Sequence, residues 1–313
     1  MLSKFLPPES SLLKGRLLRD AKLAKYTSWH VGGPADQLYF PFDRGDLVKF
    51  LSVLPVEEPV FFMGMGSNLL IRDGGIRGTV VNTRGRLKEM LICDDQTLYV
   101  EAGVHCSKVA RFCRSHGFVG AEFLSGIPGT MGGALKMNAG AFGCETWDIV
   151  EGLESITAQG DVFTRRVEDY EIGYRSVTGP VGEWFLAVRL RLAKGSTQES
   201  TEKTKALLSQ RSATQPLAQP SCGSVFKNPD NDYAARLIEA CGLKGYAVGG
   251  ANVSEQHANF ILNQNNATAE DIESLIEIIQ TQVEQRMGVA LACEVEIVGE
   301  PAKGYAHGGV SEQ

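Results

Sequence analysis

The sequence lacks long apolar runs and any excess of positive charge. No continuous apolar stretch reaches the roughly 18 residues that a membrane-spanning helix needs, so we expect no membrane association. The formal net charge of −6 over 313 residues differs from the basic balance that is typical of nucleic-acid-binding proteins. We therefore expect no nucleic-acid partner, although an acidic total still permits a local basic pocket for an anionic small molecule.

Disulfide and metal motifs are missing as well. The seven cysteines are odd in number, scattered and without a CxxC pair, which favours free thiols in a reducing compartment over a disulfide or zinc framework. The five histidines are isolated and no H-E-x-x-H motif occurs, so no metal site is expected. Residues 1–18 contain neither a continuous apolar segment nor a small-residue cleavage site, and we expect a cytoplasmic protein without a signal peptide.

What the chain does contain is a mixture of helix and strand patterns that predicts an α+β fold. Short apolar strand patterns alternate with a few amphipathic helices, and the composition becomes more polar near Gly195. We expect an irregular or partly helical lead-in over residues 2–23 and a polar tail over 301–313. The predicted helices are residues 43–54, 106–116, 197–211, 233–241 and 268–287. The predicted strands are residues 60–62, 69–71, 78–82, 98–102, 149–157, 162–167, 184–192, 259–262 and 291–298.

Two glycine-rich stretches are the first candidate site. Phe123–Gly140 carries five glycines and one proline, and we do not expect an ordinary helix in such a run. Gly64–Asn68 is a second, shorter glycine loop that follows a predicted strand. Such loops are either tight turns that pack on the core or nests of backbone N–H groups that bind an anion such as a pyrophosphate.

Known nucleotide motifs do not explain these loops. Neither loop contains a G-x-G-x-x-G motif that opens a long helix, and no G-K-[ST] follows either one. The sequence therefore disfavours both a Rossmann fold and a Walker loop. If the loops bind a cofactor, the fold that holds it is of another type.

Three further constellations carry polar groups suited to catalysis, and each has a simpler interpretation. Ser224 lies in Ser221–Pro229 with Lys227 and Asn228, but a serine in a glycine-flanked turn is more often only a turn residue. Arg175 lies between two strand-like segments, where an arginine is usually on the surface. Glu294 is two residues from Glu296 on the last predicted strand, as in a solvated edge strand.

Taken together, the motifs resemble the family of UDP-N-acetylenolpyruvoylglucosamine reductases, in its shorter type II form. The resemblance extends from about residue 27 to residue 299, with several motifs in the same order. The segments that carry it are Thr27–Ala35, Gly64–Leu70, Leu124–Gly143, Tyr174–Ser176, Arg211 with Gln215 and Pro216, Ser221–Pro229, and Glu294–Gly299.

The resemblance implies an FAD-binding fold of the vanillyl-alcohol-oxidase type, built from two α+β subdomains, and a C-terminal α+β substrate-binding domain. The implied boundaries are residues 1–82 for the first subdomain, to which 293–313 return, 83–195 for the second, and 196–292 for the substrate-binding domain. The implied reaction is the NADPH-dependent, FAD-mediated reduction of UDP-N-acetylglucosamine enolpyruvate to UDP-N-acetylmuramate in peptidoglycan precursor synthesis. FAD is the implied bound cofactor, and NADPH is the implied hydride donor.

The family's functional residues carry over onto matching positions of this chain. Arg175, Ser224 and Glu294 match the catalytic residues, and Lys227 and Asn228 match the substrate-binding segment. Cys222 stands where the family pattern has alanine, which suggests a thiol open to oxidation beside Ser224. The positions that match the FAD-binding segments are Gly64, Met65, Gly66, Ser67, Asn68, Ser125, Gly126, Ile127, Pro128, Gly129, Thr130, Gly132, Gly133, Asn138, Ala139 and Gly140.

Two alternatives stay open at this point. Another FAD-dependent sugar or alcohol oxidoreductase of the same fold group would share the glycine loops but would not need Ser221–Asn228. A nucleotide-sugar-binding protein that has lost catalysis would keep the binding residues only. The presence of Arg175, Ser224 and Glu294 speaks against the second alternative.

Overall fold

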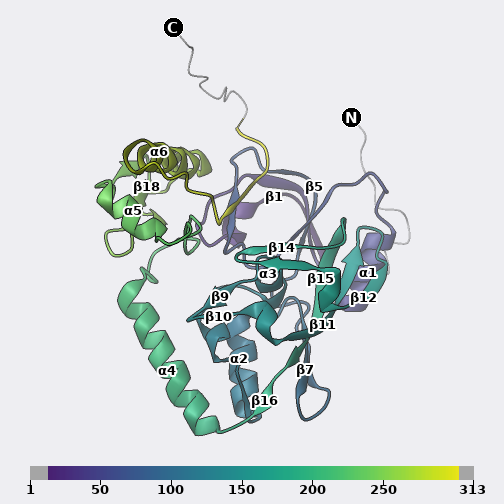
Figure 1. Cartoon of the computed structure of the whole chain (residues 1–313). Coiled ribbons are helices and arrows are strands. Elements are labelled where there is room, and N and C mark those ends of the chain that lie inside the picture. The colour runs from purple at the N-terminus through teal and green to yellow at the C-terminus, as the bar shows by residue number, and fades with distance from the viewer. Residues whose placement is uncertain (1–12, 303–313) are drawn as a thin grey trace. The chain divides into compact units, whose positions relative to one another are not determined.

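The computed structural model describes residues 13–302 (Figure 1). The chain divides into two compact units. Unit 1 contains the chain up to Leu18 together with Gln37–Ser67 and Gly78–Leu217. Unit 2 contains Arg19–Asp36, Asn68–Arg77 and the chain from Ala218 onward. Each unit is therefore assembled from segments that are distant in the sequence. The division into three domains expected from the resemblance stays a prediction.

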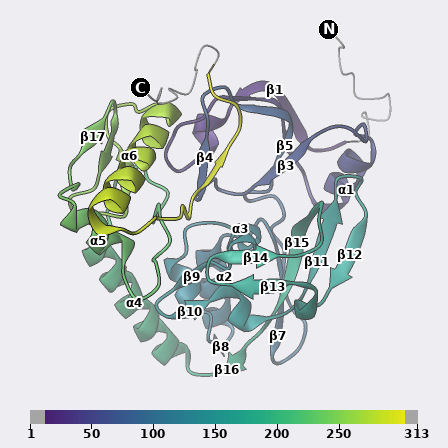
Figure 2. The same ribbon diagram turned by 45° about the horizontal axis from the view of Figure 1, so that its top comes forward.

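Unit 1 is built around a five-stranded sheet, which Figure 2 shows beside helices α2 and α3. Its strand pairs are antiparallel, and its members are, in spatial order, β12 (Val162–Arg165), β11 (Val150–Thr157), β15 (Glu183–Arg191), β7 (Thr97–Glu101) and β6 (Met90–Ile92). Helix α2 (Cys106–Ser115) buries Cys106, Val109, Ala110 and Cys113 in the same core. These positions follow the spacing of one helix face, which explains why the sequence predicted this helix correctly.

A four-stranded sheet has the order β1 (Arg16–Lys22), β2 (Pro34–Phe40), β5 (Ile76–Asn82) and β3 (Val60–Met63). Strands β3 and β5 are parallel, with Met63 opposite Asn82. The expected irregular or helical lead-in is wrong for Arg16–Lys22, which forms an edge strand. Its side chains are only partly buried, so the alternation that identifies a half-buried strand is weak in the sequence. Residues 13–15 are irregular and Leu23 begins a short 3-10 helix over Leu23–Tyr26, as expected, whereas residues 2–12 lie outside the described residues.

Unit 2 contains a small antiparallel sheet of β17 (Ala247–Val248), β18 (Ala251–Val253) and β19 (Ile261–Asn263). Helices α5 (Ala234–Ala240) and α6 (Ala269–Met287) pack in the same core. The buried Trp29 joins this core and donates its indole N–H to the carbonyl of Ile261 at 2.7 Å. Strand β20 (Glu296–Val298) pairs in parallel with β4 (Leu69–Ile71).

The predicted helices are confirmed, and α6 is confirmed in detail. Thr268 and Asp271 form a capping box at its start, and Gly288 ends it with φ at +69°, as a left-handed residue at a helix end commonly does. Helix α1 (Arg44–Ser52) begins after Asp43, which accepts the N–H of Asp46. The remaining α-helices and strands are α3 (Met131–Lys136), α4 (Thr197–Thr214), β8 (Phe118–Val119), β9 (Gly140–Ala141), β10 (Cys144–Glu145), β13 (Glu171–Gly173), β14 (Ser176–Thr178) and β16 (Ala193–Lys194).

Two expectations are wrong beyond the lead-in. The glycine-rich run was expected to contain no ordinary helix, yet Met131–Lys136 forms α3. The last strand was expected over residues 291–298, but β20 covers only Glu296–Val298, because these three residues are the ones that pair with β4. The expected polar tail lies outside the described residues from 303 onward. Within residues 13–302, no helix combines the length and apolarity needed to cross a bilayer.

A carboxylate from outside helix α6 completes its N-terminus. Asp73 accepts the backbone N–H groups of Ala269 and Glu270 at 3.1 and 3.0 Å, which satisfies two donors that have no partner inside the helix. We expect Asp73→Ala to lower the free energy of unfolding by about 1 kcal/mol, measured by urea denaturation.

Two variants control this prediction. Asp73→Asn keeps one side-chain oxygen as an acceptor and is expected to lose less stability than Asp73→Ala. Asp95 is exposed and makes no hydrogen bond with its side chain among residues 13–302, so Asp95→Ala is expected to have no effect. An equal loss in Asp73→Ala and Asp95→Ala would contradict the proposed role of Asp73.

Candidate active site

The two glycine loops of unit 1 lie in direct contact. The hydroxyl of Ser67 donates to the carbonyl of Pro128 at 2.7 Å. A Cβ atom on Gly64 would collide with the hydroxyl of Thr130, and one on Gly129 would lie 3.0 Å from the hydroxyl of Ser67. The structure therefore brings together two loops that are separated by about sixty residues in the sequence, as their expected shared role requires.

The end of strand β7 holds the second loop in place and explains the unexpected helix α3. Met131 and Gly132 donate their N–H groups to the carbonyls of Val104 and Ala102, both at 2.8 Å. A Cβ atom on Gly132 would lie 3.0 Å from the Cβ atom of Ala102. The glycine thus permits a close approach of helix and strand, and this tertiary contact outweighs the low helix propensity of the segment.

Several backbone donors in the two loops have no acceptor within the described part of the chain. Among residues 13–302, no protein group accepts a hydrogen bond from the amides of Met65, Ser67, Gly129 and Thr130. Free amide donors on two adjoining loops suit the oxygens of a pyrophosphate. The loops therefore fit the FAD that the resemblance implies.

His105 lies beside the second glycine loop, with two cationic side chains near it. His105 lies opposite Thr130 in an isolated backbone bridge. Burial and the charges of Arg84 and Lys108 lower the pKa of His105 below its ordinary value.

The other expected FAD-binding residues have different settings. Ser125 and Gly126 end a short 3-10 helix over Glu122–Gly126, and Gly132 and Gly133 lie in α3. The loop residue Asn68 belongs to unit 2. The last segment, Asn138–Gly140, contacts Arg175 through its backbone.

Arg175 lies in the two-residue turn of the hairpin formed by β13 and β14. Gly173 and Ser176 pair across this turn, and Arg175 has φ at +52°. Its guanidinium donates to the carbonyls of Asn138 and Gly140 at 3.2 and 3.0 Å. The side chain is only 16% exposed, so the interpretation of an ordinary surface arginine does not hold.

Ser224 and Glu294 belong to neighbouring backbone segments of unit 2. The N–H of Glu294 donates to the carbonyl of Val225 at 2.8 Å, and Phe226 forms a backbone bridge with Cys293. The side chain of Asn68 donates to the carbonyl of Glu294 at 2.9 Å. The structure therefore brings two of the three predicted catalytic residues into adjacent segments, while the third, Arg175, lies in unit 1.

Sequence reasoning missed Asn259, which fixes the segment that follows Ser224. The carbonyl of Asn259 accepts the N–H of Val225 at 2.9 Å, and its side chain exchanges two hydrogen bonds with the backbone of Phe226. Asn259 is 3% exposed. A single asparagine in an apolar stretch gives no sequence signal for this contact, because its partners are distant in the chain.

The substrate-binding candidates start the loop that leads to α5. The side-chain carbonyl of Asn228 accepts the N–H of Ala234 at 3.1 Å. The ammonium group of Lys227 makes no hydrogen bond or ion pair with any residue in 13–302. Lys227 is thus free to meet an anionic group.

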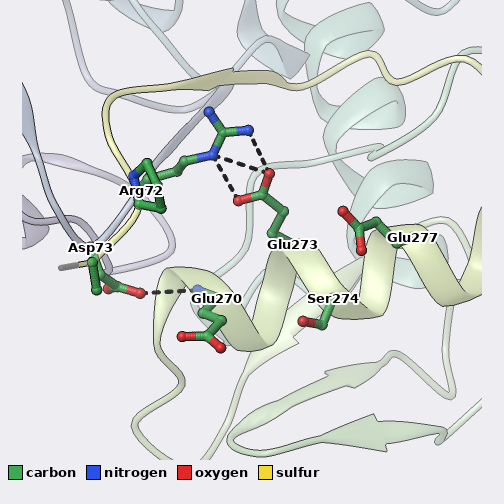
Figure 3. Close-up of a pocket in the computed structure, with 8 residues that line it drawn as sticks. Arg72, Asp73, Glu270, Glu273, Ser274 and Glu277 are labelled. Atoms are coloured by element: carbon green, nitrogen blue, oxygen red, sulfur yellow. Dashed lines mark hydrogen bonds and ion pairs between the residues drawn. The ribbon is translucent and has the colours of Figure 1, made fainter. Parts of the chain in front are cut away.

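A shallow pocket of unit 2 contains none of the predicted site residues (Figure 3). Arg72 binds Glu273 with its forked guanidinium at 2.7 to 3.1 Å, and the hydrogen bonds to Glu273 raise the pKa of Arg72 above its ordinary value. Asp73 and Glu270 line the same pocket. These contacts join Arg72 and Asp73 to helix α6 and have a structural role.

Comparisons with known proteins identify the family of the chain. A family model described as the FAD binding domain matches residues 35–165, and the C-terminal domain of UDP-N-acetylenolpyruvoylglucosamine reductase matches residues 215–298. The reductase of that name from Methylococcus capsulatus is 56% identical over 287 residues, which cover 92% of this chain and 94% of the relative. The chain belongs to the UDP-N-acetylenolpyruvoylglucosamine reductase family.

Other members of the reductase family and a solved structure support the same assignment. The reductase from Alkalilimnicola ehrlichii is 53% identical over 93% of this chain and 98% of the relative. The crystal structure of the reductase from Thermus caldophilus matches with a TM-score of 0.77 and 32% identity, covering 90% of this chain and 99% of that chain. The α+β fold with an FAD-binding part and the reductase C-terminal domain is therefore confirmed. Arg175 lies between the two matched domains, outside both.

The contact between Gly64 and Thr130 makes the cofactor site testable. We expect Gly64→Ala to lower the FAD content of the purified protein at least about tenfold, because the new methyl group forces the loops apart. The measurement is flavin absorbance per mole of protein. The second change Thr130→Ala removes the hydroxyl that collides and is expected to restore much of the FAD content.

Gly152→Ala provides the matched control, since its new methyl group would meet the nearest atom at 3.5 Å, an ordinary contact. This variant is expected to retain its FAD. If Gly64→Ala binds FAD as the unchanged protein does, the loops do not form the cofactor site.

Cys222 is protected from the oxidation that its position suggested. The residue is 4% exposed, and burial raises the pKa of its thiol to about 12, so the reactive thiolate is scarce at neutral pH. Its sulfur lies 3.4 Å from the hydroxyl of Ser28. We expect iodoacetamide to modify the exposed Cys93 in the folded protein much faster than Cys222, measured by peptide mass spectrometry. Equal rates would show that the segment before Ser224 opens readily.

Proposed function

We propose that this chain is an NADPH-dependent flavoenzyme that reduces UDP-N-acetylglucosamine enolpyruvate to UDP-N-acetylmuramate in peptidoglycan precursor synthesis. The observation that carries the proposal is the 56% identity to a reductase of that name over nearly the full length of both chains. The contact between the two glycine loops supports it independently, because it supplies a site for the cofactor. Free thiols at all seven cysteines support a cytoplasmic location as part of the proposal.

FAD, when bound, supplies the carrier that passes hydride from NADPH to the methylene carbon of the enolpyruvyl group. The protein's part begins with holding the cofactor. In the proposal, the amides of Met65, Ser67, Gly129 and Thr130 bind the pyrophosphate. The other cofactor residues expected from the resemblance keep that role as part of the proposal.

Arg175, Ser224 and Glu294 have different tasks in this reaction. As the double bond accepts hydride, negative charge develops on the substrate carboxylate and its neighbouring carbon. Arg175 provides a fixed cation for that charge. Ser224 delivers its hydroxyl proton to the carbon next to the carboxylate. Glu294 assists Arg175 as the protonated acid or by polarising a hydrogen-bond donor, because an ionised carboxylate would repel the developing negative charge. Lys227 and Asn228 bind the nucleotide-sugar part of the substrate, as the resemblance implies.

The two half-reactions separate proton delivery from cofactor reduction. We expect Ser224→Ala to reduce its flavin with NADPH at an almost unchanged rate. Reoxidation by the enolpyruvyl substrate should slow by at least about a hundredfold. Stopped-flow measurement of flavin absorbance follows both steps.

Ser221→Ala changes a nearby serine that has no proposed role in proton transfer and serves as the control. Equal loss of both half-reactions in Ser224→Ala would contradict the role of Ser224. A purified protein that neither contains FAD nor takes it up would contradict the proposed function itself.

A further inference from the structure

Arg175 is held through backbone carbonyls. Its guanidinium donates to the carbonyl oxygens of Asn138 and Gly140. The nearest oxygen of Glu145 is 3.8 Å from the guanidinium, too far for a hydrogen bond. These carbonyl acceptors fix the direction in which the guanidinium points.

The carbonyl of Asn138 faces Arg175 because the backbone of Asn138 is turned into the left-handed region. Its φ is +45°, a conformation that costs free energy for a residue with a side chain. Asn138 is 1% exposed, and both ends of its side chain are bound within the protein. Its amide group donates to Glu145 at 2.7 Å and to the carbonyl of Gly173 at 3.2 Å, while its oxygen accepts the N–H of Trp147 at 3.2 Å.

Glu145 anchors this arrangement. Its carboxylate accepts the shortest of the three hydrogen bonds of the Asn138 side chain, and it pairs through its backbone with Gly140 across strands β9 and β10. A Cβ atom at Gly140 would lie 2.7 Å from the carbonyl oxygen of Cys144 and 3.1 Å from the Arg175 guanidinium. Both carbonyls that hold Arg175 are thus connected to Glu145, one by its side chain and one by its strand.

We propose that Asn138 and Glu145 are positioning residues for Arg175. Glu145 binds the side-chain amide of Asn138. Asn138 in turn presents its backbone carbonyl to the guanidinium, and its side-chain amide also binds the carbonyl of Gly173 at the end of β13. The simpler alternative is that Glu145 acts as the counter-ion of Arg175. A partly exposed pair at 3.8 Å contributes little, whereas the hydrogen bond to Asn138 is short and partly buried. This inference rests on the role of Arg175 in the proposed function. The side chain of Asn138 is bound to protein groups, so any contact of Asn138 with FAD is made by its backbone.

Substitutions at Glu145 distinguish positioning from charge pairing. Glu145→Gln keeps an oxygen that accepts from Asn138 but removes the charge, so positioning predicts reoxidation of the reduced flavin by substrate within about threefold of the unchanged enzyme. Glu145→Ala removes the acceptor and is expected to slow that half-reaction at least about tenfold. Reduction by NADPH should stay within about twofold in both variants. An equal loss in Glu145→Gln and Glu145→Ala would overturn the proposal in favour of charge pairing.

A double-mutant cycle with Arg175→Ala tests whether Glu145 acts through Arg175. If it does, Glu145→Ala has no further effect on reoxidation once Arg175 is replaced. Additive losses in the double variant would overturn the positioning role while leaving the role of Arg175 intact. If Arg175→Ala itself leaves reoxidation unchanged, the proposed function of Arg175 fails, which is a different outcome.

Melting temperature and FAD content show whether each variant is folded. Glu151→Ala is the matched control, because Glu151 pairs with Arg191 and Thr97 instead, and we expect both half-reactions to be unchanged. Should Glu145→Ala fail to fold, Glu145→Asp draws the carboxylate back from Asn138 and is expected to slow reoxidation in the same selective way. Unchanged reoxidation in folded Glu145→Asp and Asn138→Ala would overturn the proposal.

Discussion

The main chain at Gly64 and the side chain of Thr130 lie so close that no side chain fits at residue 64. This packing constraint joins two loops of unit 1, and the hydrogen bond from Ser67 to Pro128 reinforces it. With the loops fixed against each other, their unused amide groups can act together on one anionic group. The proposed cofactor site depends on that arrangement, since isolated amides on separate loops would bind a pyrophosphate only after paying the entropy of ordering both loops.

Features that depend on local sequence were predictable. Helix α6 has its capping box, its apolar face and its terminal glycine within about twenty residues, so periodicity and end signals were sufficient. Helix α3 was missed because its glycines are stabilised by the close contact of Gly132 with Ala102, a contact that local propensity does not contain. Strand β20 was predicted too long because pairing with β4, and not apolar content, determines where it begins.

In the candidate site, too, some residues were predictable from the sequence and others were not. Arg175, Ser224 and Glu294 were predicted from motifs that resemble a known family, and the comparisons show that the chain belongs to that family. Asn259 and Glu145 had no such signal. Asn259 binds the backbone of Phe226, which is distant in the sequence, and Glu145 binds the side chain of Asn138. Residues that carry chemistry leave a motif, whereas residues that hold them in place are recognised only from contacts.

The way in which Arg175 is held has a consequence for how the site tolerates sequence change. Its hydrogen-bond acceptors at Asn138 and Gly140 are main-chain oxygens, and every amino acid supplies that atom. No substitution can delete these acceptors, so mutation can reach them only by altering the backbone dihedral angles of the turn. Sequence change at residue 138 should therefore be limited twice: bulky or β-branched residues do not readily adopt its left-handed backbone, and a residue without the amide side chain loses the hydrogen bond to Glu145.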